Sequence, residues 1–216
     1  MRIFLVVLFL TPILWASSIE EYGINSGNFV VFIPTITSNK MIVALHGSGE
    51  RANNFVQNWT KEAEARHYYV VVPNSTDPNG WSGEDMNRIM KIVATAQSTY
   101  GIKRTLLSGA SSGGQVALLL GINEYPYFNA VQTFMGLAIT EMGQYIKYQS
   151  VKKNRRPILL IHGRKDAMIP IKYAQMNRDF LKSKDYSITY WEEPNMVHED
   201  YRQDNNKILD WFERLR

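Results

Sequence analysis

The chain of 216 residues contains no cysteine. This excludes disulfide bridges, thiolate metal sites and cysteine nucleophiles, as well as a lipid-modified cysteine behind a leader segment. A large excess of one charge is also missing, since 24 Lys and Arg stand against 20 Asp and Glu. The densest basic cluster, residues 152–156, is too short for a convincing nucleic-acid patch, and we interpret it as a solvated loop. We therefore expect no nucleic-acid partner.

Long hydrophobic runs are scarce, and the longest lies within the first eighteen residues. It follows Arg2 and ends before the small residues Ala16 and Ser18, which is the layout of a secretory signal peptide over residues 1–18. An uncleaved membrane anchor is the alternative, although the run is short for a bilayer span of about 20 residues. We expect cleavage after Ser18, a secreted or periplasmic domain at 19–216, and no membrane contact after cleavage.

Beyond the leader, short β-branched apolar runs alternate with longer amphipathic stretches. The runs predict strands at residues 28–34, 40–47, 68–74, 105–110, 130–138, 156–163 and 186–193. The stretches predict helices at residues 53–66, 84–99, 112–123, 171–184 and 203–215. This alternation indicates one α/β domain with a mostly parallel sheet that is buried on both faces. We expect the first two strands to form an antiparallel hairpin at its start.

Two adjacent serines stand between glycines where a predicted strand meets a predicted helix, in the segment RTLLSGASSGGQVALLL. Gly109, Ser111 and Gly113 match G-x-S-x-G, the nucleophile elbow, in which side chains two positions from the serine would crowd the strand and the helix. Shifting the pattern by one residue makes Ser112 the nucleophile, with poorer sterics. The phosphate-binding pattern G-x-x-x-x-G-K-[ST] is absent. Ser111 is the predicted nucleophile, and a plain glycine-rich turn is the alternative.

Two backbone amides are candidate donors to an oxyanion. The residue after the nucleophile begins the helix, where its N–H and the helix N-terminus provide partial positive charge, so the Ser112 amide is the first candidate. The Ser48 amide, in the turn LHGSGE after an early strand, is the second. His46 in the same turn precedes the serine in the chain, and we expect it to brace the loop rather than to act as a base.

A carboxylate and a histidine follow at the ends of later strands, where the sites of parallel α/β sheets lie. Asp166 comes just after the run ILLIHG, and His198 lies between the last predicted strand and the last predicted helix. A serine hydroxyl needs a base to take its proton, and a carboxylate orients the imidazole, so the order Ser111, Asp166, His198 predicts a catalytic triad. Four other acidic residues compete for the role of the acid: Glu192, Glu193, Glu199 and Asp200.

The segments LHGSGE, SGASSGGQVA, ILLIHGRKDAMIP and NMVHE resemble the α/β-hydrolase superfamily over residues 40–200. The resemblance is to the small serine esterases, a group with carboxylesterases, lysophospholipases and polyhydroxyalkanoate-depolymerase-like enzymes. It implies a three-layer α/β-hydrolase fold with an antiparallel start and no large lid. It also implies a metal-independent serine hydrolase that forms an acyl-enzyme and needs no cofactor. Trp81, in the loop PNGW, is a candidate substrate-binding residue, with packing as its alternative role.

The hypothesis with the most support is an exported serine esterase that cleaves short-chain or soluble acyl esters, with a small-molecule ester as its partner. A peptidase or amidase on the same scaffold is a second hypothesis, because the triad chemistry is shared. A third is an exported binding protein that keeps the fold without activity, since a fold does not guarantee a function. The sequence carries no signal for the oligomeric state.

Overall fold

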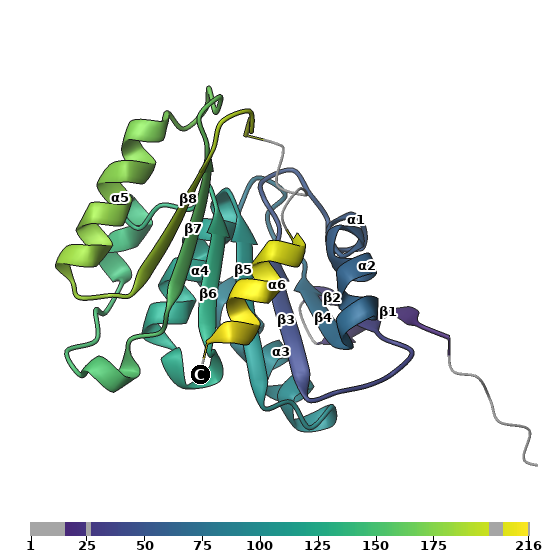
Figure 1. The fold of residues 1–216 in the computed structure, drawn as a ribbon. Helices are drawn as coiled ribbons and strands as arrows, with labels where there is room; N and C mark the ends of the chain where they lie inside the picture. The colour runs from purple at the N-terminus through teal and green to yellow at the C-terminus, as the bar shows by residue number, and fades with distance from the viewer. Residues whose placement is uncertain (1–15, 25–26, 199–204, 216) are drawn as a thin grey trace, which may run out of the picture.

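The structure is a computed structural model that describes residues 16–24, 27–198 and 205–215. Within these residues the chain forms a sheet of eight strands in the order β1-β2-β4-β3-β5-β6-β7-β8, with helices on both faces (Figure 1). The strands are β1 (Ser18–Ile24), β2 (Gly27–Ile33), β3 (Lys40–Leu45), β4 (Tyr68–Pro73), β5 (Arg104–Ala110), β6 (Ala130–Phe134), β7 (Ile158–Gly163) and β8 (Ile188–Glu193). The α-helices are α1 (Ala52–Phe55), α2 (Gln57–Arg66), α3 (Gly83–Thr99), α4 (Ser112–Asn123), α5 (Ile171–Ser183) and α6 (Asn205–Arg214). Short 3-10 helices are η1 (Tyr125–Tyr127), η2 (Glu141–Tyr145) and η3 (Lys152–Asn154).

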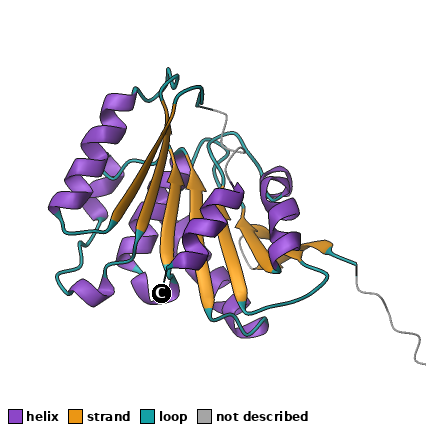
Figure 2. Cartoon of the chain, viewed as in Figure 1, coloured by secondary structure: helices purple, strands orange, loops and turns teal. Residues whose placement is uncertain are grey.

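The sheet is parallel from β4 through β3 and on to β8, and antiparallel where β1 pairs with β2 and β2 pairs with β4. The predicted α/β fold with a mostly parallel sheet and an antiparallel start is therefore confirmed. The arrows of the parallel strands point toward one edge of the sheet (Figure 2). The turns that follow these strands gather at that edge, so chemistry-bearing residues far apart in the sequence meet there.

The predicted hairpin between the first two runs is wrong. β2 pairs with β4 and with β1, a strand that the sequence pattern did not reveal, while β3 lies on the far side of β4. Residues 34–39 connect β2 to β3 and can reach up to about 20 Å, which exceeds the roughly 10 Å between strands two positions apart. A short connection therefore does not force its two strands to pair, and β4 fits between them.

Alternate residues of each central strand enter two separate hydrophobic cores. Val43 packs in the core beneath α3 and α4, whereas its neighbour Ile42 packs in the core beneath α1, α2 and α6. In Figure 1, α6 lies in front of the sheet and α4 behind it. Burial on both faces explains why these strands are apolar almost throughout, because side chains alternate between the faces along a strand.

Several predicted boundaries move for local reasons. The expected helix at 53–66 is divided into α1 and α2 at Val56. The strand expected at 130–138 ends at Phe134, because Met135 has a positive φ of 53° and the backbone of the next residue turns toward α4. A capping box begins α3, since the Asp85 N–H donates to the Ser82 hydroxyl at 3.3 Å and the Ser82 N–H to the Asp85 carboxylate at 2.8 Å.

The predicted signal peptide lies outside the described residues except for its last three, residues 16–18. Ser18 begins β1. In the part of the chain that the structure describes, none of the helices has the length and apolar character to cross a membrane.

Candidate active site

Ser111 occupies the tight turn between β5 and α4. Its backbone has φ 51° and ψ −117°, a combination that non-glycine residues rarely adopt and that costs free energy unless the surroundings hold it. The Ser111 N–H donates to the Phe134 carbonyl at 2.8 Å, and the Ser111 carbonyl accepts from the Gln115 N–H at 3.1 Å. The turn is thus fixed by the neighbouring strand on one side and by the first helical turn on the other.

The flanking glycines provide the space for this turn. A Cβ on Gly109 would lie 2.2 Å from the Gly113 carbonyl oxygen, and a Cβ on Gly113 would lie 2.3 Å from the Leu45 carbonyl oxygen. Both distances are below 3.0 Å, which real Cβ atoms essentially never show. The spacing of the glycines is therefore a steric requirement of the elbow, and it places Ser111 rather than Ser112 at the strained position.

The structure brings Ser111, His198 and Asp166 together from the ends of three strands. His198 Nε2 lies 2.9 Å from Ser111 Oγ, and His198 Nδ1 lies 2.8 Å from Asp166 Oδ2. The Asp166 side chain is fully buried, and 10% of the His198 side chain is exposed. A carboxylate beside Nδ1 favours the tautomer with its proton on that nitrogen, which leaves Nε2 to accept the serine proton. The three groups form one hydrogen-bonded chain that can activate the hydroxyl.

The Asp166 carboxylate is held by donors on both oxygens. Oδ1 accepts from the Met168 N–H at 2.9 Å and from the Ile169 N–H at 2.7 Å. Oδ2 faces His198 and also lies 3.3 Å from His162 Nε2, which donates to the Ile169 carbonyl at 2.7 Å. These donors compensate for the burial of the carboxylate and fix its orientation toward His198.

The loop that carries His198 is pressed against the end of β7. A Cβ on Gly163 would lie 2.0 Å from the Met196 carbonyl oxygen, so only glycine allows this approach. The same carbonyl accepts from the Lys165 N–H at 3.2 Å, and the Met196 N–H donates to the Glu193 carbonyl at 3.4 Å. Backbone contacts therefore position His198 over the elbow.

Ser48 and Ser112, the predicted oxyanion donors, are neighbours beside Ser111. The Ser48 hydroxyl donates to the Ser112 hydroxyl at 3.1 Å. Among the described residues neither backbone N–H has a hydrogen-bond acceptor, and Ser112 lies in the first turn of α4, where N–H groups lack helical partners. Both amides are therefore available to a bound oxygen atom.

Three side chains brace the turn at residues 45–50, and one of them, Glu50, was not assigned a role from the sequence. The Gly47 N–H donates to the Glu50 carboxylate at 2.8 Å. As expected, His46 has a bracing role: its Nε2 accepts from the Ser75 N–H at 3.3 Å. The Trp81 indole N–H donates to the His46 carbonyl at 3.0 Å, and the two rings lie 4.7 Å apart. Glu50 is the last residue of the turn LHGSGE, but nothing in the sequence indicated that its carboxylate accepts from the Gly47 amide.

Glu192 does not replace Asp166 as the partner of His198. The Glu192 carboxylate accepts from Gln175 at 2.8 Å and from Arg164 at 3.0 Å, and the Gln175 donor holds the pKa of this carboxyl below its usual value. Of the acidic residues that the structure describes, Asp166 is the one hydrogen-bonded to His198. Glu199 and Asp200 lie outside the described residues.

The sequence itself now assigns a family. Residues 81–214 match the model of the phospholipase/carboxylesterase family of α/β-hydrolases. The chain belongs to this family. It is therefore an α/β-hydrolase of an esterase family, and membership of that family implies a small-molecule ester as substrate. No curated protein sequence matches the chain significantly.

Solved structures share the fold of this phospholipase/carboxylesterase family member. A thermostable esterase is 18% identical, with a TM-score of 0.69 over 92% of this chain and 62% of that one, so the chain spans less than two thirds of its length. An acetyl xylan esterase from Aspergillus awamori is 13% identical, with a TM-score of 0.77 over 91% of this chain and 99% of that one. An acylaminoacyl peptidase from Pyrococcus horikoshii is 17% identical, with a TM-score of 0.67 over 94% of this chain and 42% of that one.

Two buried histidines in this member of the phospholipase/carboxylesterase family have altered pKa values. Burial lowers the pKa of His46 and that of His162, because a charged imidazole loses hydration inside the protein. Both rings are therefore neutral at neutral pH, and their hydrogen bonds to backbone groups are those of structural residues.

Proposed function

We propose that the protein is a serine esterase in which Ser111 is the nucleophile, His198 the general base and acid, and Asp166 the orienting carboxylate. The observation that carries the proposal is the hydrogen-bonded chain from Ser111 Oγ to His198 at 2.9 Å and from His198 to Asp166 at 2.8 Å. Side chains at these distances can transfer the serine proton during attack. Family membership supports the same chemistry.

The proposed reaction begins when His198 Nε2 takes the Ser111 proton and Oγ forms a bond to the ester carbonyl carbon. The carbonyl oxygen becomes an oxyanion, which accepts hydrogen bonds from the Ser48 and Ser112 amides. Asp166 stabilises the imidazolium. The bond to the leaving oxygen then breaks, His198 protonates the alcohol, and an acyl-enzyme remains. Water, deprotonated by His198, attacks the acyl carbon, releases the carboxylic acid and restores Ser111.

Matched ester and anilide substrates with one acyl group test this proposal. We expect hydrolysis of the ester and slower or no hydrolysis of the anilide, because an amine is a poorer leaving group than a phenol. Loss of ester hydrolysis in His198→Ala would tie the activity to this site. Comparable rates on both substrates would favour a peptidase or amidase, and a folded protein inactive on both would favour a binding function.

We further propose that residues 1–18 direct export and that the domain of residues 19–216 acts on short-chain or soluble acyl esters. The leader pattern of one basic residue, an apolar run and small residues supports export. N-terminal sequencing of protein recovered from the periplasm or the medium tests it. A mature chain beginning at residue 19 is the expected result, and retention of residues 1–18 in the membrane fraction would contradict it.

A further inference from the structure

A basic cleft of about 620 Å³ lies at the end of the sheet opposite to the elbow. Six of the residues that line it are cationic: Lys103, Arg104, Lys152, Lys153, Arg155 and Arg156. None of the lining residues that the structure describes is acidic. The whole chain has a net charge of +4, so the cleft gathers more cations than the chain carries in excess. The cluster at residues 152–156 is short by itself, but the fold adds Lys103 and Arg104 to it.

The basic cleft crosses the amino ends of four neighbouring strands. Its lining includes the residues directly before β3, β5, β6 and β7, which are Asn39, Lys103, Asn129 and Pro157. Neighbouring strands lie about 4.8 Å apart, so the order β3-β5-β6-β7 gives the cleft a length of about 14 Å. The seven residues of β5 separate it from Ser111 by roughly 20 Å. A ligand in the basic cleft therefore leaves the candidate active site open.

Backbone carbonyls hold the three guanidinium groups of the cleft in place without neutralising them. Arg104 donates to the Leu215 carbonyl at 2.6 Å, and Arg156 donates to the Tyr125 carbonyl at 2.9 Å. Arg155 donates to two backbone carbonyls, at 2.8 and 3.1 Å. A guanidinium has five N–H donors, so each group keeps donors and its full charge for a ligand.

Carboxylate partners are scarce in the basic cleft. Four arginines elsewhere pair with a carboxylate at 2.7 to 2.9 Å: Arg66, Arg88, Arg164 and Arg178. Within the part of the chain that the structure describes, Arg104 and Arg156 have no such partner, and Arg155 has Asp185 at 3.4 Å. The Asp185 side chain is 79% exposed, and an ion pair this open to water contributes little. The positive charge of the cleft is therefore not offset from within the described fold.

The shape of the cleft and the chemistry of its lining favour a slender anion. Guanidinium groups bind the oxygens of a phosphate through parallel hydrogen bonds. The Arg155 side chain is 15% exposed, so a narrow ligand reaches it more readily than the flat surface of a bilayer does. Pro157 and Leu215, the apolar lining residues, offer little area for insertion into a membrane.

We propose that the basic cleft binds a soluble linear anion that carries several phosphate groups in a row. Such a chain contacts cations along the whole length of about 14 Å, whereas a single phosphate contacts those at one place. The attractions of the separate cations add, because each acts on a nearby negative charge. The site lies apart from the triad, so the proposal stands or falls independently of the esterase proposal.

Titration calorimetry of the purified protein with inorganic tripolyphosphate and with orthophosphate tests the proposal. We expect a Kd for tripolyphosphate that is lower by about tenfold or more at the same ionic strength, and that rises as salt screens the charges. Lys152→Glu/Lys153→Glu reverses two exposed charges of the cleft and should raise this Kd by about tenfold or more. The variant keeps the Lys153 carbonyl that accepts from Arg156 at 3.2 Å, so the guanidinium stays in place.

Lys61→Glu/Lys91→Glu is the matched control, because it changes the net charge equally at exposed residues of α2 and α3 outside the cleft lining. It should leave the Kd for tripolyphosphate within about twofold of wild type. Equal weakening in both double variants would overturn the proposal, since the overall charge alone would then attract the anion. Equal affinity for orthophosphate and tripolyphosphate would overturn it as well. Binding to phosphatidylglycerol vesicles, or to a single-stranded oligonucleotide, without binding to tripolyphosphate would also contradict it and indicate a membrane or nucleic-acid surface instead.

Discussion

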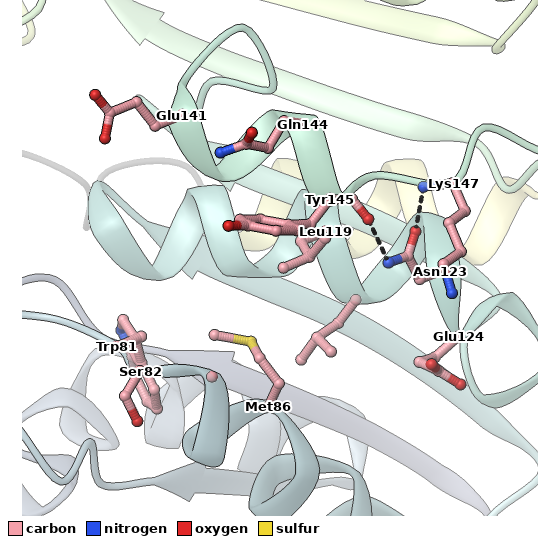
Figure 3. Close-up of a pocket in the computed structure, with 12 residues that line it drawn as sticks. Trp81, Ser82, Met86, Leu119, Asn123, Glu124, Glu141, Gln144, Tyr145 and Lys147 are labelled. Carbon is pink, nitrogen blue, oxygen red and sulfur yellow. Dashed lines mark hydrogen bonds between the residues drawn. The ribbon is translucent and has the colours of Figure 1, made fainter.

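The elbow at the start of α4 and a groove of about 780 Å³ lined by the start of α3, the second half of α4 and η2 lie at opposite ends of the same helix and are built in different ways (Figure 3). At the elbow, backbone meets backbone: a Cβ on Gly113 would lie 2.3 Å from the Leu45 carbonyl oxygen. Along the groove, side chains line open space, and a Cβ on Gly83 at the start of α3 would meet nothing within 4 Å. The first region tolerates almost no change in shape, whereas the second does.

This difference places the strict geometric requirements at the elbow. A nucleophile works when the hydroxyl, base and oxyanion donors are held within tenths of an ångström, and backbone contacts do this without side-chain freedom. Met86 and Tyr145, which line the groove, can be substituted without touching that geometry. We therefore expect substitutions at the elbow to lower activity on every substrate, and substitutions at Met86 or Tyr145 to leave the triad geometry intact.

The largest contrast is expected between the two adjacent serines. Ser111→Ala removes the nucleophile and should lower kcat by about 10⁴ to 10⁶. Ser112→Ala keeps the backbone amide and loses only the hydroxyl contact with Ser48, so the loss should stay within about tenfold. Steady-state hydrolysis of one ester by both variants, with circular dichroism as the folding control, measures the contrast. Equal losses would mean that the assignment of the nucleophile is wrong.

Asp166→Asn should have the next largest effect. An amide cannot favour the tautomer that leaves His198 Nε2 as the acceptor, and a loss of about 10⁴ in kcat is typical of such a change. Glu192→Gln is the matched control, because this carboxylate pairs with Arg164 and Gln175 rather than with His198. We expect the control to stay within a few fold of wild type in kcat. A large loss of kcat in Glu192→Gln with a small loss in Asp166→Asn would mean that Glu192, not Asp166, orients His198.

The two glycines test the structural side of the comparison. Gly113→Ala forces a Cβ into the Leu45 and His46 carbonyls, and overpacking of this kind costs about 1–3 kcal/mol or more of the free energy of unfolding. Gly83→Ala meets no atom and should be neutral or stabilise α3 by up to about 1 kcal/mol. Urea unfolding of both variants gives the two values. Similar stabilities would show that the elbow is less tightly packed than described.

The smallest effect should come from the buried histidines. Because burial lowers the pKa of His46 and His162 below the ordinary value of 6.5, the unfolded chain binds more protons as pH falls through 6.5. The free energy of unfolding should therefore decrease between pH 7.5 and pH 5.5. This window lies above the range in which carboxyl groups titrate. The urea unfolding midpoints of the wild type at these two pH values should differ, and His46→Asn should reduce the difference between them. A wild-type midpoint that does not change over this window would contradict the expectation.

Local patterns in the sequence predicted most of the strands and helices, because burial on both faces leaves continuous apolar runs and the cap at Ser82 and Asp85 is a local signal. The sequence also predicted that Ser111, Asp166 and His198 lie after strands, and parallel strands bring their carboxyl ends to the same end of the sheet. The sequence did not predict β1, because an edge strand pairs on one side only and this one carries two glutamates that interrupt its apolar pattern.

Features that depend on non-local contact could not be predicted. The pairing of β2 with β4 is decided by which strands fit together, not by the loop length. The hydrogen bond from the Gly47 amide to the Glu50 carboxylate and the close approach of Gly136 to Gly114 produce no periodic pattern in the sequence. The groove joins residues 81–86, 119–124 and 141–147, which become neighbours only in the folded chain.

The most direct test of the central claim is labelling of the folded protein with a fluorophosphonate, followed by peptide mapping. Such probes react with a serine that its base has activated. We predict a single label on Ser111, retained in Ser112→Ala and lost in His198→Ala. A label on Ser112, or no label on folded protein, would contradict the account.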